Sequence, residues 1–241
     1  MTELVMILAG LAPAVLLFLY IWKKDPVPEP LRLLLKGVFW GALICIPVGV
    51  VEMMISNILF GGGEPTNLIG TTMQAFFVAA LPEEAFKLLA FWLLVRKNPY
   101  FDEHIDGIVY AVCVGLGFAA FENIGYLFGN QDSWQSVAVV RALMAVPGHY
   151  AFAVLMGYYY SLYHFVNRST RNYVSILLMP VLFHGIYDAL LMTSIVSTAI
   201  GSVCFFIAVW FCIRMHKFCQ RRVIAQLDRD KYQTVIDQWT V

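Results

Sequence analysis

The sequence predicts an all-α protein, a polytopic membrane helix bundle of about seven transmembrane helices. Of its 241 residues, 60% are apolar and only 13% are charged, whereas a soluble domain carries about 25% charged residues. Apolar runs long enough to span a bilayer recur along the whole chain. Basic residues are alternately present and absent in the links between these runs, as the positive-inside rule requires. We therefore expect a multi-pass protein of the cell membrane, embedded in the lipid bilayer.

The expected spans follow the apolar runs in order. The first run has no basic segment ahead of it and is followed by Lys23 and Lys24, which indicates a retained span and not a signal peptide. Only a short turn near residue 196 divides the last two runs. The expected spans are residues 4–22, 34–56, 67–95, 105–128, 136–164, 174–194 and 197–214.

The distribution of lysine and arginine predicts the orientation of these spans. Lysine and arginine occur in every second link and in the tail, so we expect the N-terminus outside and the C-terminus in the cytoplasm. Residues 1–214 then form one transmembrane domain. Residues 215–241 form a polar cytoplasmic tail, with a short amphipathic helix around residues 223–227. The net charge of zero gives no reason to expect nucleic acid as a partner.

The third span carries two adjacent acids and a lysine at its centre. A charged side chain at the centre of a membrane helix costs roughly 2.5–3.5 kcal/mol, so such groups indicate a functional site. Lys87 follows Glu83 by four residues and Glu84 by three, which places it between both carboxylates on the helix surface. Pro82 directly precedes the acids and removes a backbone hydrogen bond, so we expect a kink or break there.

Proline also precedes the two central histidines. Pro147 comes two residues before His149, and Pro180 comes four residues before His184. Asp188 follows His184 by four residues and shares its face, where it can orient the imidazole or contact the reacting centre. We expect a helix disturbance before each of these groups.

The fourth span contributes Phe118, Glu122 and Asn123. Phe118 and Glu122 share a face. At about 1.5 Å per residue, Glu122 lies at the depth of Arg141 in the fifth span, so these two residues can pair. The polar groups of four spans should meet in one central cavity.

The charges within the spans do not balance. Apart from Glu52 near the outer edge, there are four acids against Lys87 and Arg141, plus two histidines. Buried charge must be paired, protonated or bound to metal. One divalent ion and shared protons satisfy this count equally, and the sequence does not choose between them. No serine or cysteine lies beside these groups as a nucleophile, so water is the expected attacker in a hydrolysis.

The same residues resemble a known family. Glu83-Glu84-x-x-Lys87, Gly117-Phe118-x-x-Phe121-Glu122-Asn123 and His184-x-x-x-Asp188, with Asp106-Gly107 and an isolated His149, are similar to the motifs of the PrsW intramembrane proteases. That family is a branch of the type II CAAX prenyl endopeptidase superfamily. The resemblance covers residues 67–194, the protease-like core. The second motif ends in Glu122, as in the PrsW branch, where the superfamily usually has histidine.

The resemblance implies an intramembrane endopeptidase that acts in regulated proteolysis. It implies catalytic roles for Glu83, as the base that activates water, and for Glu84, Lys87 and Asp188. It implies that Glu122, His149 and His184 line the centre as metal ligands or oxyanion stabilisers, with zinc as the candidate ion and a metal-free glutamate mechanism as the alternative. Phe118, Asn123 and Arg141 are supporting residues. The implied substrate is a single-span or membrane-anchored protein, such as an anti-sigma factor.

Other functional classes remain open at this stage. Proton- or ion-coupled transporters also bury glutamate, aspartate and histidine and use broken helices. They usually contain paired repeats, and none is visible here. An inactive relative that serves as a binding or immunity protein is a third interpretation, which the intact set of motifs disfavours.

Overall fold

The computed structural model describes the backbone of residues 2–239, and the side chains of that range except residues 234 and 236–239. The described chain is entirely helical apart from short links, and it contains no strand. Its elements are α1 (Thr2–Trp22), α2 (Leu31–Phe60), α3 (Leu68–Met73), η1 (Gln74–Ala80), α4 (Leu81–Val95), α5 (Asp106–Gly129), η2 (Gln131–Ser133), α6 (Trp134–Val140), η3 (Arg141–Ala145), α7 (Val146–Ser161), η4 (Leu162–Val166), α8 (Thr170–Val196) and α9 (Thr198–Trp239).

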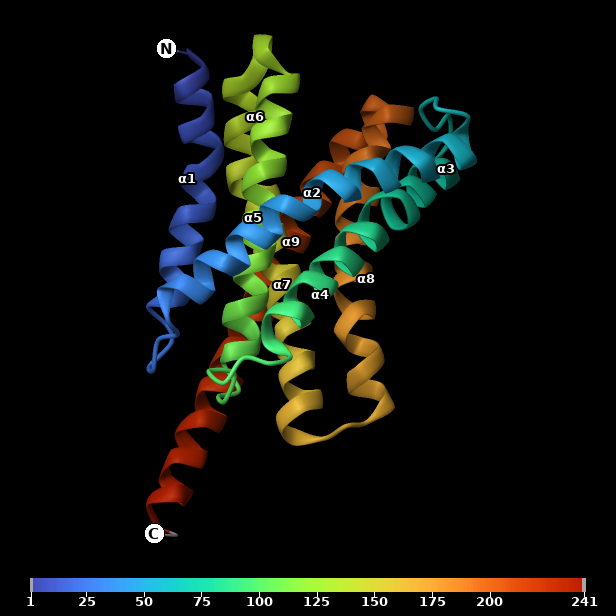
Figure 1. Ribbon diagram of the computed structural model, residues 1–241. Coiled ribbons are helices and arrows are strands. Elements are labelled where there is room, and N and C mark those ends of the chain that lie inside the picture. Colours follow the sequence, from blue (N-terminus) through green and yellow to red (C-terminus); the bar gives the residue numbers. More distant parts are fainter. Residues whose placement is uncertain (1, 240–241) are drawn as a thin grey trace.

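Helix α5 is the centre of the bundle. It is buried along most of its length and packs against α1, α2, α4 and α7, and Figure 1 shows α2 crossing it obliquely. Glycines allow the closest crossings, because a Cβ at Gly41 would collide with the backbone of Val114 and one at Gly117 with the backbone of Val38. Such small residues bring membrane helices close enough for backbone contact. The site residues of α5 are therefore held by helices on several sides.

Two prolines coincide with a change of helix type. The π-helical segment η1 ends just before Pro82, where the Leu81 amide donates to the Phe76 carbonyl. In the same way η3 ends just before Pro147, where the Val146 amide donates to the Arg141 carbonyl. π-Bulges of this kind are frequent at functional sites. The expectation of a disturbance at Pro180 was wrong, because α8 passes through that residue as an uninterrupted α-helix.

The helices are those of a multi-pass integral membrane protein. Among the described residues, six helical segments are long and apolar enough to cross a membrane. The seventh helical stretch, residues 68–95, is not one of the six, and it carries Glu83, Glu84 and Lys87. The expected division near residue 196 is confirmed, since α8 ends at Val196 and α9 begins at Thr198. The orientation of the termini stays a prediction.

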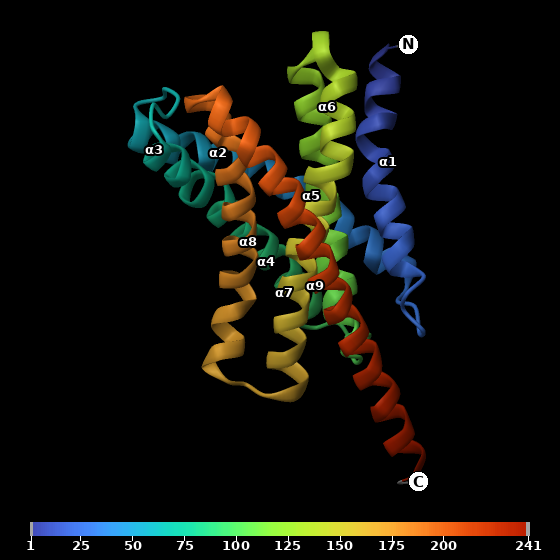
Figure 2. The same ribbon diagram turned by 180° about the vertical axis from the view of Figure 1, so that it is seen from behind.

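The C-terminal segment differs from the expected short helix at residues 223–227. Helix α9 continues without a break to Trp239, and Figure 2 shows it crossing the near side of the bundle and projecting beyond it. Met215, Cys219 and Val223 are buried in the main hydrophobic core. These buried side chains explain why the helix extends: its apolar stripe packs on the bundle, although most of its other residues there are polar.

Candidate active site

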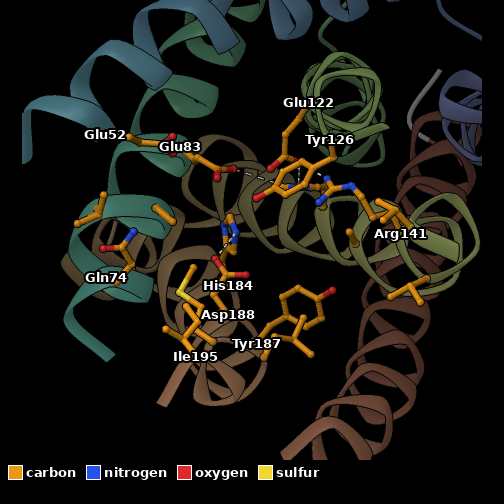
Figure 3. Close-up of a pocket in the computed structure, with 18 of the residues that line it drawn as sticks. Glu52, Gln74, Glu83, Glu122, Tyr126, Arg141, His184, Tyr187, Asp188 and Ile195 are labelled. Atoms are coloured by element: carbon orange, nitrogen blue, oxygen red, sulfur yellow. Dashed lines mark hydrogen bonds and ion pairs between the residues drawn. The ribbon is translucent and has the colours of Figure 1, made fainter. Parts of the chain in front are cut away.

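Polar residues from α4, α5, η3, α7 and α8 converge inside the bundle. We call the following set the active-site cluster: Glu83, Glu84, Lys87, Glu122, Arg141, His149, His184 and Asp188. Most of its members line a cavity of about 920 Å³, and Figure 3 shows Glu83, Glu122, His184 and Asp188 turned towards it. The expected convergence of separate spans on one cavity is confirmed.

Lys87 contacts three other members of the active-site cluster. Its ammonium nitrogen lies 2.9 Å from Glu83 Oε2, 2.8 Å from Glu84 Oε1 and 3.1 Å from His149 Nδ1. It also lies 4.1 Å from the centre of the Phe118 ring, a cation–π contact. The lysine is only 3% exposed, so its three donors are satisfied by protein groups alone. The expected position of Lys87 between both acids is confirmed.

His149 connects the lysine to Glu122. Its Nδ1 must accept from Lys87, because an ammonium group only donates. Its Nε2 therefore carries the proton and donates to Glu122 Oε2 over 2.9 Å. The neighbours thus define one neutral tautomer of His149, which spans the gap between α4 and α5.

Arg141 supplies the second fixed positive charge. Its Nη2 lies 2.6 Å from Glu122 Oε2, and its Nε donates to Asn123 Oδ1 over 2.7 Å. The expected pairing of Arg141 with Glu122 is confirmed. Asn123 in turn donates to the Gly10 carbonyl over 2.9 Å, which ties the site to α1. The guanidinium group also lies 3.9 Å from the centre of the Tyr126 ring.

His184 lies between two carboxylates. Its Nδ1 is 2.9 Å from Glu84 Oε1, and its Nε2 is 3.2 Å from Asp188 Oδ2. The ring stacks on Phe152, with 4.6 Å between ring centroids and 16° between ring planes. Both the tilt and the rotation of this imidazole are therefore defined, and the expected contact with Asp188 is confirmed.

The two adjacent glutamates have different surroundings. Glu84 is fully buried between Lys87 and His184 and does not line the cavity. Glu83 shares Lys87 but lines the cavity wall. Glu83 is thus the member of the pair that can meet a water molecule or a substrate. Which of the expected site residues take part in chemistry stays a prediction.

The donor groups suit a divalent metal ion in type and number. Glu83, Glu84, His149 and His184 each offer one ligand atom, and these atoms lie within 4.8 Å of one another. Two carboxylates and two imidazoles are a donor set that zinc accepts. The ammonium group of Lys87 bonds to three of these four residues. A metal ion can therefore bind here only if the Lys87 side chain moves away from them. Glu122, an expected ligand, lies outside this group and pairs with Arg141.

Several cavity residues were missed or set aside at the level of sequence. Glu52 of α2, expected to be an interfacial charge, lines the cavity together with Gln74, Tyr126 and Tyr187. Tyr126 follows Glu122 by four residues on α5, so helical spacing alone could have identified it. Glu52 and Gln74 gave no such signal, because their place depends on how α2 packs against α5 and how η1 packs against α8.

The sequence is similar to those of known proteases. The family model for PrsW family intramembrane metalloproteases matches residues 29–213. Protease PrsW of Oceanobacillus iheyensis is 38% identical over 184 residues, which cover 76% of this chain and 81% of that protein. Protease PrsW of Geobacillus kaustophilus is 38% identical over 189 residues, covering 78% and 80%. Protease PrsW of Bacillus subtilis is 33% identical over 186 residues, covering 76% and 81%.

No solved structure matches the chain significantly. The family match covers most of the bundle, including all four helices that form the active-site cluster. The relatives are matched over about four-fifths of their own length. The chain belongs to the PrsW family of intramembrane proteases.

Proposed function

We propose that this protein hydrolyses peptide bonds of membrane-anchored proteins with water activated by Glu83. The observation that carries the proposal is the position of the Glu83 carboxylate: it lies at the wall of a polar cavity inside a membrane bundle and is held there by Lys87. Glutamate is a common general base in hydrolysis. The cavity can hold the water that the reaction consumes, whereas the surrounding lipid cannot.

Glu83 takes one proton from water while the water oxygen attacks the carbonyl carbon of the substrate. The carbonyl oxygen becomes an oxyanion, and the Arg141 guanidinium group at the same cavity offers positive charge to it. Glu83 then returns the proton to the leaving amine, and the C–N bond breaks. Water is consumed, and one carboxyl and one amino terminus are produced.

The remaining residues position these groups. Glu84 holds Lys87 and His184 at the same time, so it links α4 to α8. Lys87 in turn holds both Glu83 and His149. Asp188 holds the second nitrogen of His184. Each group that faces the cavity is therefore supported by a second polar residue behind it, as preorganised sites require.

A metal ion, where one is bound, would be held by Glu84, His149 and His184 once Lys87 has moved away from them, which leaves Glu83 as the base. Such an ion supplies a Lewis acid that polarises the substrate carbonyl and acidifies bound water. The metal-free alternative relies on Lys87 and Arg141 for positive charge. Metal analysis of the purified protein separates these cases: a stoichiometric ion that is lost in His184→Ala supports the metalloenzyme, and an unchanged content in the variant contradicts it.

We infer that the substrates are single-span or membrane-anchored proteins, with anti-sigma factors as the class that the family resemblance suggests. A cavity inside the bundle is reached from the lipid or from one membrane face, which favours a substrate that is itself membrane-anchored. The matched relatives carry protease names, so the transporter alternative has no support from them.

The test uses the Glu83→Gln variant and a co-expressed single-span reporter. Glutamine keeps the size of the side chain and an acceptor for Lys87, but it cannot take a proton from water. We expect cleavage to fall by at least about a hundredfold, the contribution typical of a general base. Asp132→Asn, an exposed acid in η2, is the matched control and should cleave normally. Cleavage by Glu83→Gln at the wild-type rate would refute the proposal.

A further inference from the structure

A second group of acids lies outside the active site, where the link between α1 and α2 meets the start of α5. It consists of Glu29 in that link, Asp102 in the loop after α4 and Asp106 at the first turn of α5, and we call it the Asp106 cluster. One carboxylate oxygen from each residue lies within 4.8 Å of the others. Glu29 is 7% exposed and Asp106 is fully buried, while Asp102 is exposed.

The backbone holds these carboxylates in place. Asp106 Oδ2 accepts from the amides of Asp102 and Glu103 over 2.9 and 2.7 Å, which folds the loop over the start of α5. Glu29 Oε2 accepts from the Tyr110 hydroxyl over 2.6 Å, one helical turn after Asp106. One oxygen of each buried acid thus accepts from the protein, and the two side chains also lie within hydrogen-bonding distance of each other.

The carboxylates of the Asp106 cluster lack a positive partner. Asp106 Oδ1 is buried without a hydrogen-bond donor, and so is Oδ2 of the neighbouring Asp25. Among the described residues, no lysine or arginine forms an ion pair with any member of the Asp106 cluster. Converging buried carboxylates need a proton or a cation between them.

We propose that Glu29, Asp102 and Asp106 bind a hard divalent cation of the Mg²⁺ and Ca²⁺ class. All three donors are carboxylate oxygens, which these ions prefer over the nitrogen and sulfur ligands of zinc sites. The exposed Asp102 gives the ion a path from solvent, and the two buried acids supply the fixed part of the site. The bound ion joins the α1–α2 link to the start of α5.

Thermal unfolding of the full-length protein in detergent tests this site. The protein is first stripped with EDTA and then titrated with Mg²⁺ or Ca²⁺ in separate arms. At a hundredfold excess over the dissociation constant, we expect the unfolding temperature to rise by roughly 5 °C. Asp102→Asn should remove most of this rise, and since Asp102 is exposed the variant should still fold. Asp132→Asn, exposed at the opposite end of α5, should keep the full rise.

Terbium luminescence provides a second measurement that does not depend on stability. Tb³⁺ replaces hard divalent ions and is sensitised by a nearby tyrosine, here Tyr110, which bonds to Glu29. We expect a saturable signal that His184→Ala retains, and that Asp102→Asn and Tyr110→Phe lose. A signal lost in His184→Ala instead would assign the ion to the active site. Absence of both the thermal shift and the terbium signal in the wild type would overturn the proposal in favour of shared protons.

Discussion

The active-site cluster and the Asp106 cluster both bury carboxylates, but they differ in what lies beside those carboxylates. In the active site, Lys87 and Arg141 each contact the acids directly, and both histidines lie within hydrogen-bonding distance of a carboxylate. In the Asp106 cluster, the donors are a tyrosine hydroxyl and backbone amides. The active-site cluster contains the positive side chains that neutralise its acids. The acids of the Asp106 cluster have no such side chain and need a solvent ion or a proton.

This difference supports the separate function that we propose for each cluster. A site for proton transfer needs one base at the cavity wall that neighbouring charges orient, and Glu83 lines the cavity and contacts Lys87. A site for a structural cation needs unpaired oxygen donors at fixed positions, and the Asp106 cluster has those. Both clusters contain an acid that is almost completely buried, so burial alone would not separate the two functions.

The largest expected effect that bears on this comparison is the loss of Lys87. Lys87→Met leaves two buried carboxylates beside His149 without their cation, and breaking a buried pair of this kind costs about 3–5 kcal/mol. We expect a large fall in the unfolding temperature and no detectable cleavage. Lys97→Met, which removes an exposed lysine after α4, is the control and should change neither. Wild-type stability in Lys87→Met would mean that the active-site acids are not held by this lysine.

A smaller effect is expected from Asp188, which positions His184. Asp188→Asn keeps the side-chain volume but weakens the contact with His184 Nε2. Mutation of a residue that orients a functional histidine typically lowers activity about 10- to 100-fold. The pH profile of cleavage should also shift, because the charge beside the imidazole is removed. The unfolding temperature should stay near the wild-type value. An unchanged rate together with an unchanged pH profile would exclude a positioning role.

The smallest effect should appear in the pH dependence of stability without divalent ions. Burial raises the pKa of Asp25 to about 6 and that of Glu103 to about 7, both well above their usual values near 4. The folded state therefore binds more protons than the unfolded state between about pH 4 and pH 7, so stability should fall as the pH rises through this range.

Asp25→Asn should flatten part of this slope, because it removes a carboxyl group whose ionisation destabilises the folded protein. Thermal unfolding in EDTA from pH 4 to pH 8 measures both slopes. A wild-type protein whose stability rises over the same range would contradict the assigned direction, and the acids beside the Asp106 cluster would then be paired with positive charge, as those of the active site are.

Much of the active site was predictable from residue spacing along single helices. Lys87 contacts both glutamates because residues three and four apart share a helix face, and His184 contacts Asp188 for the same reason. The pairing of Arg141 with Glu122 followed from their depth in neighbouring spans. The bond between His149 and Lys87 could not be predicted, since it depends on the rotation of α7 relative to α4.

Other features depended on contacts between distant segments. Glu52 was set aside as an interfacial charge, yet the crossing of α2 over α5 brings it to the cavity. The last helix was expected to be short, but it packs on the bundle and continues to Trp239. Asp230 in this helix accepts hydrogen bonds from the amides of His104 and Ile105 over 2.6 and 2.9 Å. The Asp106 cluster drew no metal prediction because Glu29 is far in the sequence from Asp102 and Asp106.

By itself, the sequence determined that this protein is a helical membrane bundle with acids and histidines buried in four of its spans. Hydropathy and helical periodicity are local properties, and they do not depend on how the helices pack. The tertiary structure decided which glutamate faces the cavity, which donors Lys87 serves and which acids lie together without a cation. These outcomes depend on the rotation and crossing of helices, which many weak contacts between distant residues determine together.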